Sequence, residues 1–270
     1  MSFASNRPYN ELPLLPPQAE IETVAVLRKA ISAGRALAEL KGLGGTIPNQ
    51  ELLINSIILQ EARASSEIEN VVTTNDELFK AFSAKSNAFD PATKEVLRYR
   101  EALWEGFTEL KQRGFLSTNL FIKIYQTIKK TEAGLRQTSG TALVNGAGRI
   151  IYTPPEGEDV IRKKLKNLED YLHGDDKTDP LVKMALLHYQ FESVHPFTDG
   201  NGRTGRILNI LYLVQKELLD LPVLYLSSYI IQHKSDYYRK LRAVTEKGEW
   251  EPWIMYMLAA VEQTAIGTRN

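Results

Sequence analysis

The sequence predicts an all-α fold with one small β-hairpin. Along most of the chain, apolar residues recur every three or four positions, which is the spacing of one face of a helix. Residues that cap helices precede these stretches repeatedly, whereas strand-forming residues gather convincingly at one place only. With 270 residues, 43% of them hydrophobic, the chain can bury one large core or two modest ones side by side.

The predicted elements follow one another with short connections. Residues 11–17 carry three prolines and should run extended over the surface, because each proline disfavours the helical conformation of the residue before it. Helices are expected at residues 21–41, 49–70, 91–112, 117–130, 158–174, 180–195 and 202–211, then after Ser227 and from Glu249. The weakest stretch, residues 83–90, divides an N-terminal region of residues 1–90 from a domain of residues 91–270.

Two Asp-Pro pairs mark the starts of two long helices. In Asp90-Pro91 and Asp179-Pro180, the aspartate can cap the first turn, and the proline takes the first helical position, where its missing N–H costs nothing. Between them, residues 141–155 carry β-branched side chains on both sides of Asn145-Gly146, a dipeptide that favours a tight hairpin turn. We therefore expect one hairpin inside an otherwise helical chain.

The composition narrows the classes of function and location. Thirty-three basic residues balance thirty-three acidic ones, so no net charge attracts nucleic acid or an anionic membrane, and any anion site must be local. Cysteine is absent, which excludes disulfides, thiolate metal sites and a cysteine nucleophile. No stretch approaches the roughly 18 apolar residues of a membrane helix, and the first residues contain no apolar run. We expect a cytoplasmic protein that binds neither a membrane nor nucleic acid.

The residues best suited to chemistry occupy twelve consecutive positions, His195-Pro-Phe-Thr-Asp-Gly-Asn-Gly-Arg-Thr-Gly-Arg206. Pro196 cannot continue the preceding helix, so His195 should lie at a helix end. The turn at residues 199–202 opens the next helix, where unpaired backbone N–H groups and the positive end of the helix dipole suit a phosphate. Its glycines let a ligand approach the backbone closely.

Charged side chains complete this segment. Arg203 and Arg206 are three residues apart on the new helix, so both can point to one face and hold phosphate oxygens. Asp199 is a hard oxygen ligand of the kind that Mg²⁺ takes beside substrate phosphates. With His195 as a base for an attacking hydroxyl, the segment offers the groups that phosphoryl or nucleotidyl transfer needs.

Each of these features has a common structural explanation when it stands alone. A histidine at a helix end is more often structural than catalytic, Asp-Gly-Asn-Gly is usually a turn, and two arginines three apart usually form a solvated face. Their coincidence within twelve residues is what favours phosphate chemistry. His188, by contrast, lies two helical turns before His195, too far for a metal pair, and we expect it to be a packed core residue.

The twelve-residue segment resembles the Fic-family signature, His-Pro-Phe-x-Asp/Glu-Gly-Asn-Gly-Arg-x-x-Arg, with every defining position filled. The resemblance implies a mostly helical Fic fold with a catalytic core at about residues 115–255, and transfer of AMP from Mg·ATP to Ser, Thr or Tyr of a target protein. It makes His195 the base, packs Phe197 under the loop and assigns Mg²⁺ to Asp199. The implied ATP-binding residues are Gly200, Asn201, Gly202, Arg203, Thr204, Gly205, Arg206 and Tyr237.

Gly202 bears on the type of reaction. In the related Doc kinases a lysine replaces the second glycine of the loop, which resembles a reversed nucleotide orientation and phosphate transfer, so glycine implies AMP transfer. Three alternatives stay open: removal of AMP in the same site, phosphotransfer, and an inactive module that binds a nucleotide or a partner. The expected partners are a target protein with a hydroxyl side chain and the chain itself through self-modification. A homodimer stays an option.

A second element, Ser65-Ser-Glu-Ile-Glu-Asn70, resembles the inhibitory motif Ser/Thr-x-x-x-Glu-Gly/Asn, with Ser65, Glu69 and Asn70 in register. By itself the run is typical of a solvated helix end. The resemblance places the chain in the Fic subclass that carries an inhibitory helix in its N-terminal region. Glu69 is then expected to pair with Arg203, which would take this guanidinium from the γ-phosphate and hold ATP in an unproductive pose.

Weaker resemblances concern the walls of the site. The hairpin resembles the Fic flap, which clamps a target strand by edge pairing, and Ile151 and Tyr152 are the expected contacts. A small structural hairpin would explain the same residues. Tyr237 and Tyr238 resemble the aromatic pair that borders the adenine, whereas Thr245 stands where the family often has asparagine, so no adenine contact is assigned to it.

Overall fold

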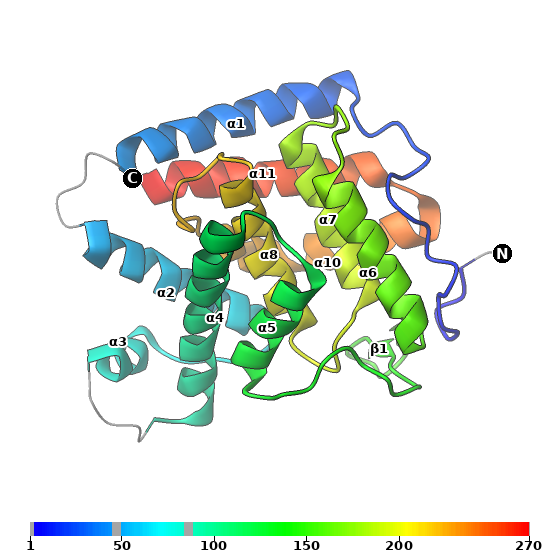
Figure 1. The fold of residues 1–270 in the computed structure, drawn as a ribbon, viewed down its shortest axis with the longest axis horizontal. Coiled ribbons are helices and arrows are strands. Elements are labelled where there is room, and N and C mark those ends of the chain that lie inside the picture. The colour runs from blue at the N-terminus through cyan, green and yellow to red at the C-terminus, as the bar shows by residue number, and fades with distance from the viewer. Residues whose placement is uncertain (1–2, 45–49, 84–88, 270) are drawn as a thin grey trace.

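The computed structural model describes residues 3–44, 50–83 and 89–269, which form eleven helices and one two-stranded antiparallel sheet (Figure 1). The helices are α1 (Val24–Gly44), α2 (Gln50–Ile68), α3 (Asn75–Ser83), α4 (Pro91–Arg113), α5 (Thr118–Lys129), α6 (Glu158–His173), α7 (Pro180–Val194), α8 (Asn201–Gln215), α9 (Leu226–Gln232), α10 (Lys234–Lys247) and α11 (Trp250–Arg269). The strands are β1 (Leu143–Val144) and β2 (Ile150–Tyr152). The predicted all-α fold with one hairpin is confirmed.

Two helices start where the sequence predicts a cap. Asp90 Oδ1 accepts a hydrogen bond from the Thr93 N–H at 3.0 Å, and Asp179 Oδ1 accepts one from the Leu181 N–H at 2.8 Å. In both helices, α4 and α7, a proline occupies the first turn. The caps satisfy N–H groups that have no partner inside the helix, which defines the start of each helix.

Differences from the prediction concern helix boundaries. The helix expected after Ser227 is two helices, α9 and α10, because the chain breaks at His233, whose φ of −120° and ψ of 33° are not helical. Helix α3 has no counterpart in the prediction, since its nine residues are too few for a clear periodic signal. The start signal at Pro48-Asn49 and the centre of the boundary at 83–90 lie outside the described residues.

Helices α7 and α8 lie in the interior, with other helices packed around them (Figure 1). Both are buried around most of their circumference, polar residues such as His188 and Asn209 included. His188 stacks on Trp253 with an interplanar angle of 7°, so the prediction of a packed core histidine is confirmed. The segment from His195 onward therefore joins two core helices.

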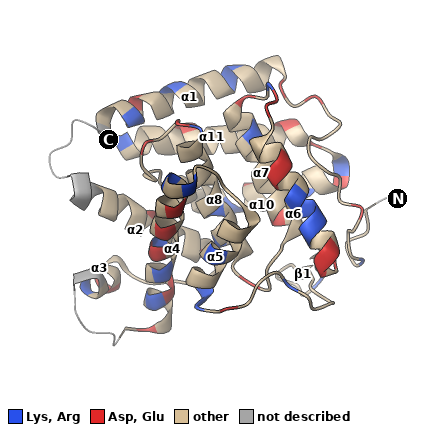
Figure 2. Ribbon diagram, viewed as in Figure 1, with Lys and Arg blue, Asp and Glu red and all other residues tan. Residues whose placement is uncertain are grey.

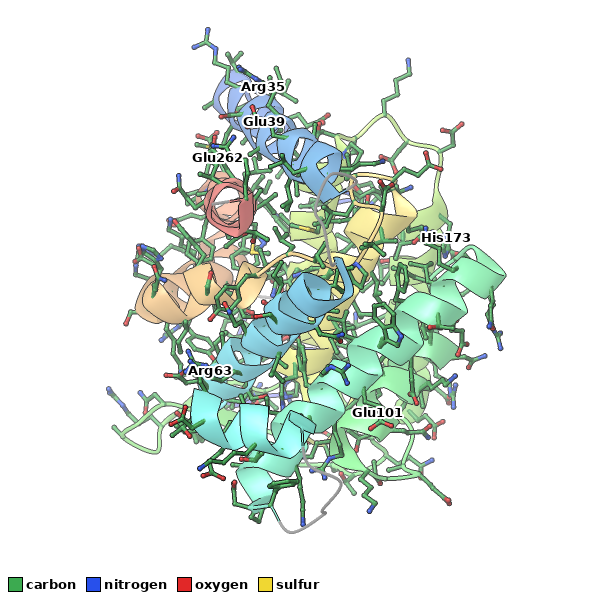
Figure 3. All side chains as sticks on the ribbon, turned by 90° about the vertical axis from the view of Figure 1, so that its left-hand side faces the viewer. Arg35, Glu39, Arg63, Glu101, His173 and Glu262 are labelled. Carbon is green, nitrogen blue, oxygen red and sulfur yellow. The ribbon has the colours of Figure 1, made fainter. Side chains whose placement is uncertain are left out.

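Helix α1 lies along α11, so the first and last helices of the described chain pack together (Figure 3). Ion pairs join them: Lys29 pairs with Glu262, and Arg269 pairs with Glu39. Leu37 of α1 belongs to the same hydrophobic cluster as residues of α7, α8 and α11. The division at about residue 90 remains a prediction, because this core contains residues from both sides of it.

Charged residues of both signs are interspersed over the outer helices in the view of Figure 2. Helix α4, for example, carries lysines, arginines and glutamates along one length. This mixture agrees with the balanced charge of the sequence. None of the described helices combines the length and the apolar character that crossing a membrane would require.

The leader before α1 docks on α6 and supports the hairpin. Leu15 exchanges two hydrogen bonds with the side chain of Asn167, and the Tyr9 N–H donates to Thr153 O at 3.0 Å. The leader has no regular secondary structure, but Leu12 and Leu15 are buried. The other residues of 11–17 are exposed or half-buried, so the predicted run over the surface agrees with the structure, and these two leucines anchor it to the core.

The hairpin is present as predicted, but its turn is longer than the tight turn that Asn145-Gly146 favours. The Asn145 N–H donates to Arg149 O at 2.9 Å, and Asn145 Oδ1 accepts from the Arg149 N–H at 3.0 Å. The positive φ falls on Gly148, at 73°. Asn145 thus organises a wider loop through its side chain, as asparagine does in many turns.

Candidate active site

Seven of the predicted site residues line one cavity of about 630 Å³. Its walls come from the end of α2, the hairpin, the end of α7, the first turns of α8, and α10. The predicted residues that line it are Glu69, Ile151, Tyr152, His195, Gly202, Arg206 and Tyr237. Because these residues are spread over much of the sequence, only the folded chain brings them together.

His195 ends α7 in a left-handed conformation, with φ 48° and ψ 59°. Nδ1 is buried, which leaves Nε2 as the nitrogen that the cavity can reach. Burial, followed by the nearby Arg136 guanidinium, lowers the pKa of His195 to about 4. The imidazole is therefore neutral near pH 7 and can accept a proton.

The loop between α7 and α8 is held by Asn201. Its Oδ1 accepts from the Phe197 N–H and its Nδ2 donates to Phe197 O, both at 2.8 Å. Phe197 is buried and stacks on Tyr125, with ring centroids 4.2 Å apart. Gly200 has a φ of 72°, which favours glycine, at the start of α8. The Asn201 side chain is thus occupied by the loop, and only its backbone N–H is left for a ligand.

Arg206 is the arginine that meets α2. It is 1% exposed, and its Nε donates to Ser65 Oγ at 2.8 Å. Its Nη2 donates to Ser65 O at 2.8 Å and to Glu69 Oε1 at 2.9 Å. The predicted pair of Glu69 with Arg203 is therefore wrong. A spacing of three residues places the side chains of Arg203 and Arg206 about 60° apart around the helix axis, and only Arg206 faces α2.

The Glu69 carboxylate lies over the first turn of α8. A Cβ atom on Gly202 would overlap Glu69 Oε1 and would lie 2.9 Å from Arg206 Nη1. This first turn has backbone N–H groups without an acceptor inside the helix, and the dipole makes it positive. Glu69 therefore occupies the place that would otherwise attract a phosphate.

Arg203 points away from the cavity, toward α4 and α5. Its Nη1 donates to Glu95 Oε1, and its Nη2 lies 3.9 Å from Asp199 Oδ1. Lys129, at the end of α5, joins the same cluster: its Nζ lies 2.9 Å from Glu95 Oε1 and 2.6 Å from Asp199 Oδ2. Two cations and two carboxylates balance, so the cluster holds the Asp199 turn beside the start of α8.

Asp199 lies directly before the first turn of α8 but outside the lining of the cavity, and its role as a magnesium ligand stays a prediction. Its side chain is 63% exposed, and its Oδ2 already attracts the Lys129 ammonium. Burial acts to raise the pKa of Asp199, but Lys129, the Gly200 N–H and Arg203 outweigh it and hold the pKa below its ordinary value. The described residues contain no group of three or more His, Cys, Asp or Glu able to hold a metal. Mg²⁺ at Asp199 would thus need nucleotide phosphate oxygens as further ligands.

Besides Arg203, two further residues that the resemblance assigns to ATP lie away from the cavity. Thr204 is fully buried in α8, and its Oγ1 has no hydrogen-bond partner within the described parts of the chain. Gly205 faces α7: a Cβ atom there would lie 2.6 Å from Glu192 Oε1 and 3.1 Å from Phe191 Cδ1. Gly205 therefore allows α7 and α8 to pack closely, and the structure does not bring it to the proposed ligand.

Glu192 lines the same cavity as His195, one turn before it, and is outside the predicted set. Its Oε1 is buried and has no partner among the residues that the structure describes. Burial raises the pKa of Glu192 to about 8, although Arg206 acts in the opposite direction, so the carboxyl is mostly protonated near pH 7. An acidic residue within a core helix is the signal that could have identified it.

Helix α10 gives the cavity an aromatic wall. Tyr237 is buried, and its hydroxyl lies 2.8 Å from His188 Nε2. Tyr238 and Thr245 line the cavity as well. The Thr245 hydroxyl lies 2.9 Å from Tyr189 Oη, so it already has a partner within the protein. An apolar wall with few polar groups suits a flat base.

The hairpin is anchored to α7 by Tyr152. The Tyr152 hydroxyl donates to Ser193 O at 2.7 Å, and its ring packs against Phe3 and Tyr9 of the leader. Ile151, also on β2, lines the cavity with an apolar side chain. Of the two residues predicted to contact a target, Tyr152 therefore also has a structural role.

Further charged residues at the site are outside the predicted set: Glu95 of α4, Lys129 of α5, and Arg136 before β1. Each contacts residues that are distant in the sequence. No spacing or motif marks such residues, because the contact depends on how the helices pack. An alignment of relatives is the kind of signal that could have found them.

Comparisons with known proteins agree with this geometry. The model of the Fic/DOC family N-terminal region matches residues 27–108, and the model of the Fic/DOC family matches residues 115–213. The protein adenylyltransferase fic-1 of Caenorhabditis elegans is 33% identical over 133 residues, which are 45% of this chain and 24% of that protein. A probable protein adenylyltransferase of Aquifex aeolicus (strain VF5) is 29% identical over 188 residues, 67% of this chain and 55% of that protein. The matches thus span about a quarter and about half of these relatives.

Solved structures share the fold. A Fic family protein from Desulfovibrio desulfuricans G20 superposes with a TM-score of 0.77 at 23% identity, covering 93% of this chain and 75% of that chain. Fic-1 of C. elegans, residues 134–508, superposes with a TM-score of 0.68 at 18% identity, covering 90% of this chain and 73% of that chain. At these identities the likeness concerns the arrangement of helices.

Proposed function

Because this chain belongs to the Fic/DOC family, we propose that it transfers AMP from ATP to a hydroxyl side chain of a target protein, with His195 as the general base. One observation supports this most: His195 and the anion-binding first turn of α8 open into the same cavity, together with Arg206. A base and a phosphate-binding turn are the parts that nucleotidyl transfer needs from the protein.

The nucleotide phosphates would lie on the first turn of α8, against the backbone at Gly202 and the guanidinium of Arg206. Asp199 would hold Mg²⁺ beside the phosphates, and this ion would neutralise part of their charge. The adenine would lie against the aromatic wall that includes Tyr237. Arg203 contributes indirectly, since it holds the Asp199 turn through the cluster with Glu95.

The reaction follows from these positions. The target hydroxyl of a Ser, Thr or Tyr gives its proton to Nε2 of His195, and its oxygen attacks the α-phosphorus of ATP. The bond from this phosphorus to the bridging oxygen breaks, and pyrophosphate leaves. His195 must be neutral to act as a base, which its low pKa ensures near pH 7. Ile151 on the hairpin would contact the target chain beside the cavity.

The resting site is inhibited by α2 in this proposal. Glu69 occupies both Arg206 and the first turn of α8, so incoming phosphates would meet a negative charge where they need a positive one. Asn70 follows with a φ of 62°, and this left-handed residue ends α2 directly after Glu69. Ser65 binds Arg206 from the same helix. We therefore expect low activity from the protein alone.

The test uses ATP labelled at the α-phosphate and the Glu69→Gly variant. Labelling of the protein itself, or of proteins in an added lysate, should rise about tenfold or more over wild type, because about 1.4 kcal/mol of relieved competition is already a factor of ten. Adding His195→Ala to Glu69→Gly should abolish the label. Glu67→Gly is the matched control, since it makes the same substitution in the last turn of α2 without a contact to Arg206.

Label from the γ-phosphate would instead indicate phosphotransfer. Incubation of the variant with an AMP-modified target would reveal removal of AMP. If Glu69→Gly neither transfers the α-label nor differs from Glu67→Gly, the proposed activity and its inhibition by Glu69 are both contradicted.

A further inference from the structure

A buried arginine lies behind His195. Arg136 belongs to the segment between α5 and β1, is 3% exposed, and makes its hydrogen bonds to carbonyl oxygens. Its Nε donates to His195 O at 2.8 Å, and its Nη2 donates to Val194 O at 3.3 Å and to Pro155 O. Its backbone N–H donates to Pro196 O at 2.9 Å. One residue thus contacts the backbone of three consecutive positions around the proposed base.

These contacts stabilise an unfavourable backbone conformation and satisfy carbonyl groups that have no partner within α7. His195 has a left-handed conformation and precedes a proline, a position at which the helical regions are disfavoured. The carbonyls of Val194 and His195 lie at the end of α7, where no helical N–H reaches them and the helix dipole is negative. A guanidinium satisfies both needs, since it donates several hydrogen bonds in a fixed plane and carries a positive charge.

The same guanidinium joins His195 to the hairpin. Pro155, whose carbonyl it binds, lies three residues after the end of β2. Tyr152 makes a second link of this kind, because its hydroxyl binds Ser193 O on α7. The hairpin, which would contact the target, and His195, which would take its proton, are therefore held in a defined position relative to each other.

We propose that Arg136 is a positioning residue: it holds the backbone of residues 194–196 so that the His195 ring faces the cavity as a base. The proposal rests on the function proposed above for His195. It assigns no contact between Arg136 and substrate, because the guanidinium is surrounded by carbonyl oxygens behind the histidine.

Arg136 also acts on His195 through its charge. After burial, it is the group that most lowers the pKa of His195, whereas the backbone of Glu192, Glu69 just after α2 and Asp199 of the loop raise it. Removing the cation should therefore raise the pKa of His195 toward the ordinary value of 6.5. More of the imidazole would be protonated near neutral pH, and less of it could act as a base.

The first measurement does not depend on activity. The chain has four histidines, so the ring signals of His195 can be assigned by NMR with a His195→Gln variant and followed against pH. Arg136→Met should raise the pKa of His195, and Arg136→Lys, which keeps the cation, should leave it close to wild type. Arg98→Met is the matched control, because Arg98 also donates from Nε to a carbonyl, Ile128 O at 3.0 Å, and not to the carbonyls of residues 194–196.

The second measurement is kinetic and uses the Glu69→Gly background. Arg136→Lys should lower kcat on the order of 10²-fold with little change in KM for ATP, since a misplacement of about 1 Å has an effect of that size. A kcat equal to that of the parent in Arg136→Lys would overturn the positioning role, even if Arg136→Met does not fold.

The two measurements separate the possible failures. If no variant transfers AMP, the proposed function fails, while the titration of His195 still tests the link to Arg136. If Arg136→Met leaves the pKa of His195 where Arg98→Met leaves it, the inference about Arg136 is overturned whatever the activity.

Discussion

At the scale of single residues, one amide side chain supports the loop of the proposed site. Asn201 satisfies both the N–H and the carbonyl of Phe197, and the stacked ring of Phe197 then holds the loop on α5. Asn167 makes the same pair of bonds to Leu15 in the leader. The two asparagine side chains therefore make the same pair of hydrogen bonds to a backbone, and only Asn201 lies at the proposed site.

This pair allows a matched prediction. Asn201→Ala and Asn167→Ala should each lower the free energy of unfolding by about 1–3 kcal/mol, because each leaves a backbone N–H and carbonyl without their partner. In the Glu69→Gly background, AMP transfer should fall strongly only with Asn201→Ala. Urea unfolding and the α-label assay measure the two effects, and an equal loss of transfer in both variants would contradict a specific role of the loop.

At the scale of elements, the inhibition depends on how α2 is docked. Buried Glu61 accepts hydrogen bonds from the Ser227 N–H at 2.8 Å and from the Tyr99 hydroxyl at 3.0 Å, which fastens the middle of α2. Lys234 Nζ donates to Ile68 O at 2.6 Å at its end. Since the helix is bound along its length, a rotation of the Glu69 side chain is a more accessible route to activation than release of α2.

Ser65 and Ser66 test this view of α2. Ser65→Ala removes the acceptor of the buried Arg206 Nε and should lower the free energy of unfolding by about 1–3 kcal/mol. Its labelling with α-labelled ATP should rise less than that of Glu69→Gly, because Glu69 remains in place. Ser66→Ala is the control, since Ser66 Oγ is buried without a partner among the described residues. Activation by Ser65→Ala equal to that by Glu69→Gly would indicate that helix docking controls the site.

At the scale of the whole molecule, titratable groups in the cavity, His195 and Glu192, and buried His188 beside it couple stability to pH. Burial lowers the pKa of His188 to about 3, and burial with Arg136 lowers that of His195 to about 4, both from 6.5. The unfolded chain then binds more protons than the folded one below pH 6.5, so this stabilisation is lost as pH falls toward 4. Burial raises the pKa of Glu192 from 4.5 to about 8, so its contribution is lost as pH rises through this range.

The free energy of unfolding should therefore decrease on both sides of an intermediate pH. Glu192→Gln, which keeps the shape without the charge, should reduce the decrease between pH 4.5 and 8. His195→Gln should reduce the decrease between pH 6.5 and 4. Urea unfolding at several pH values gives these curves, and a curve for Glu192→Gln parallel to that of wild type would contradict the assignment.

The sequence by itself determined most of the helices, the hairpin and the segment 195–206, although it indicated neither the short helix α3 nor the break between α9 and α10. Helical periodicity, the capping residues Asp90 and Asp179, and the order of residues around His195 are local properties of the chain. They depend on residues that are close in the sequence and not on contacts with distant segments. For the same reason, the sequence indicated a histidine at a helix end followed by a new helix start.

Only the tertiary structure decided which residues meet there. The partner of Glu69 is Arg206 and not Arg203, because rotation around α8 and the position of α2 select between two arginines that look alike in the sequence. Gly205 faces α7 and not the cavity because of its position around the axis of α8. Arg136 joins His195 across a distance that no local pattern encodes, since long-range packing determines it.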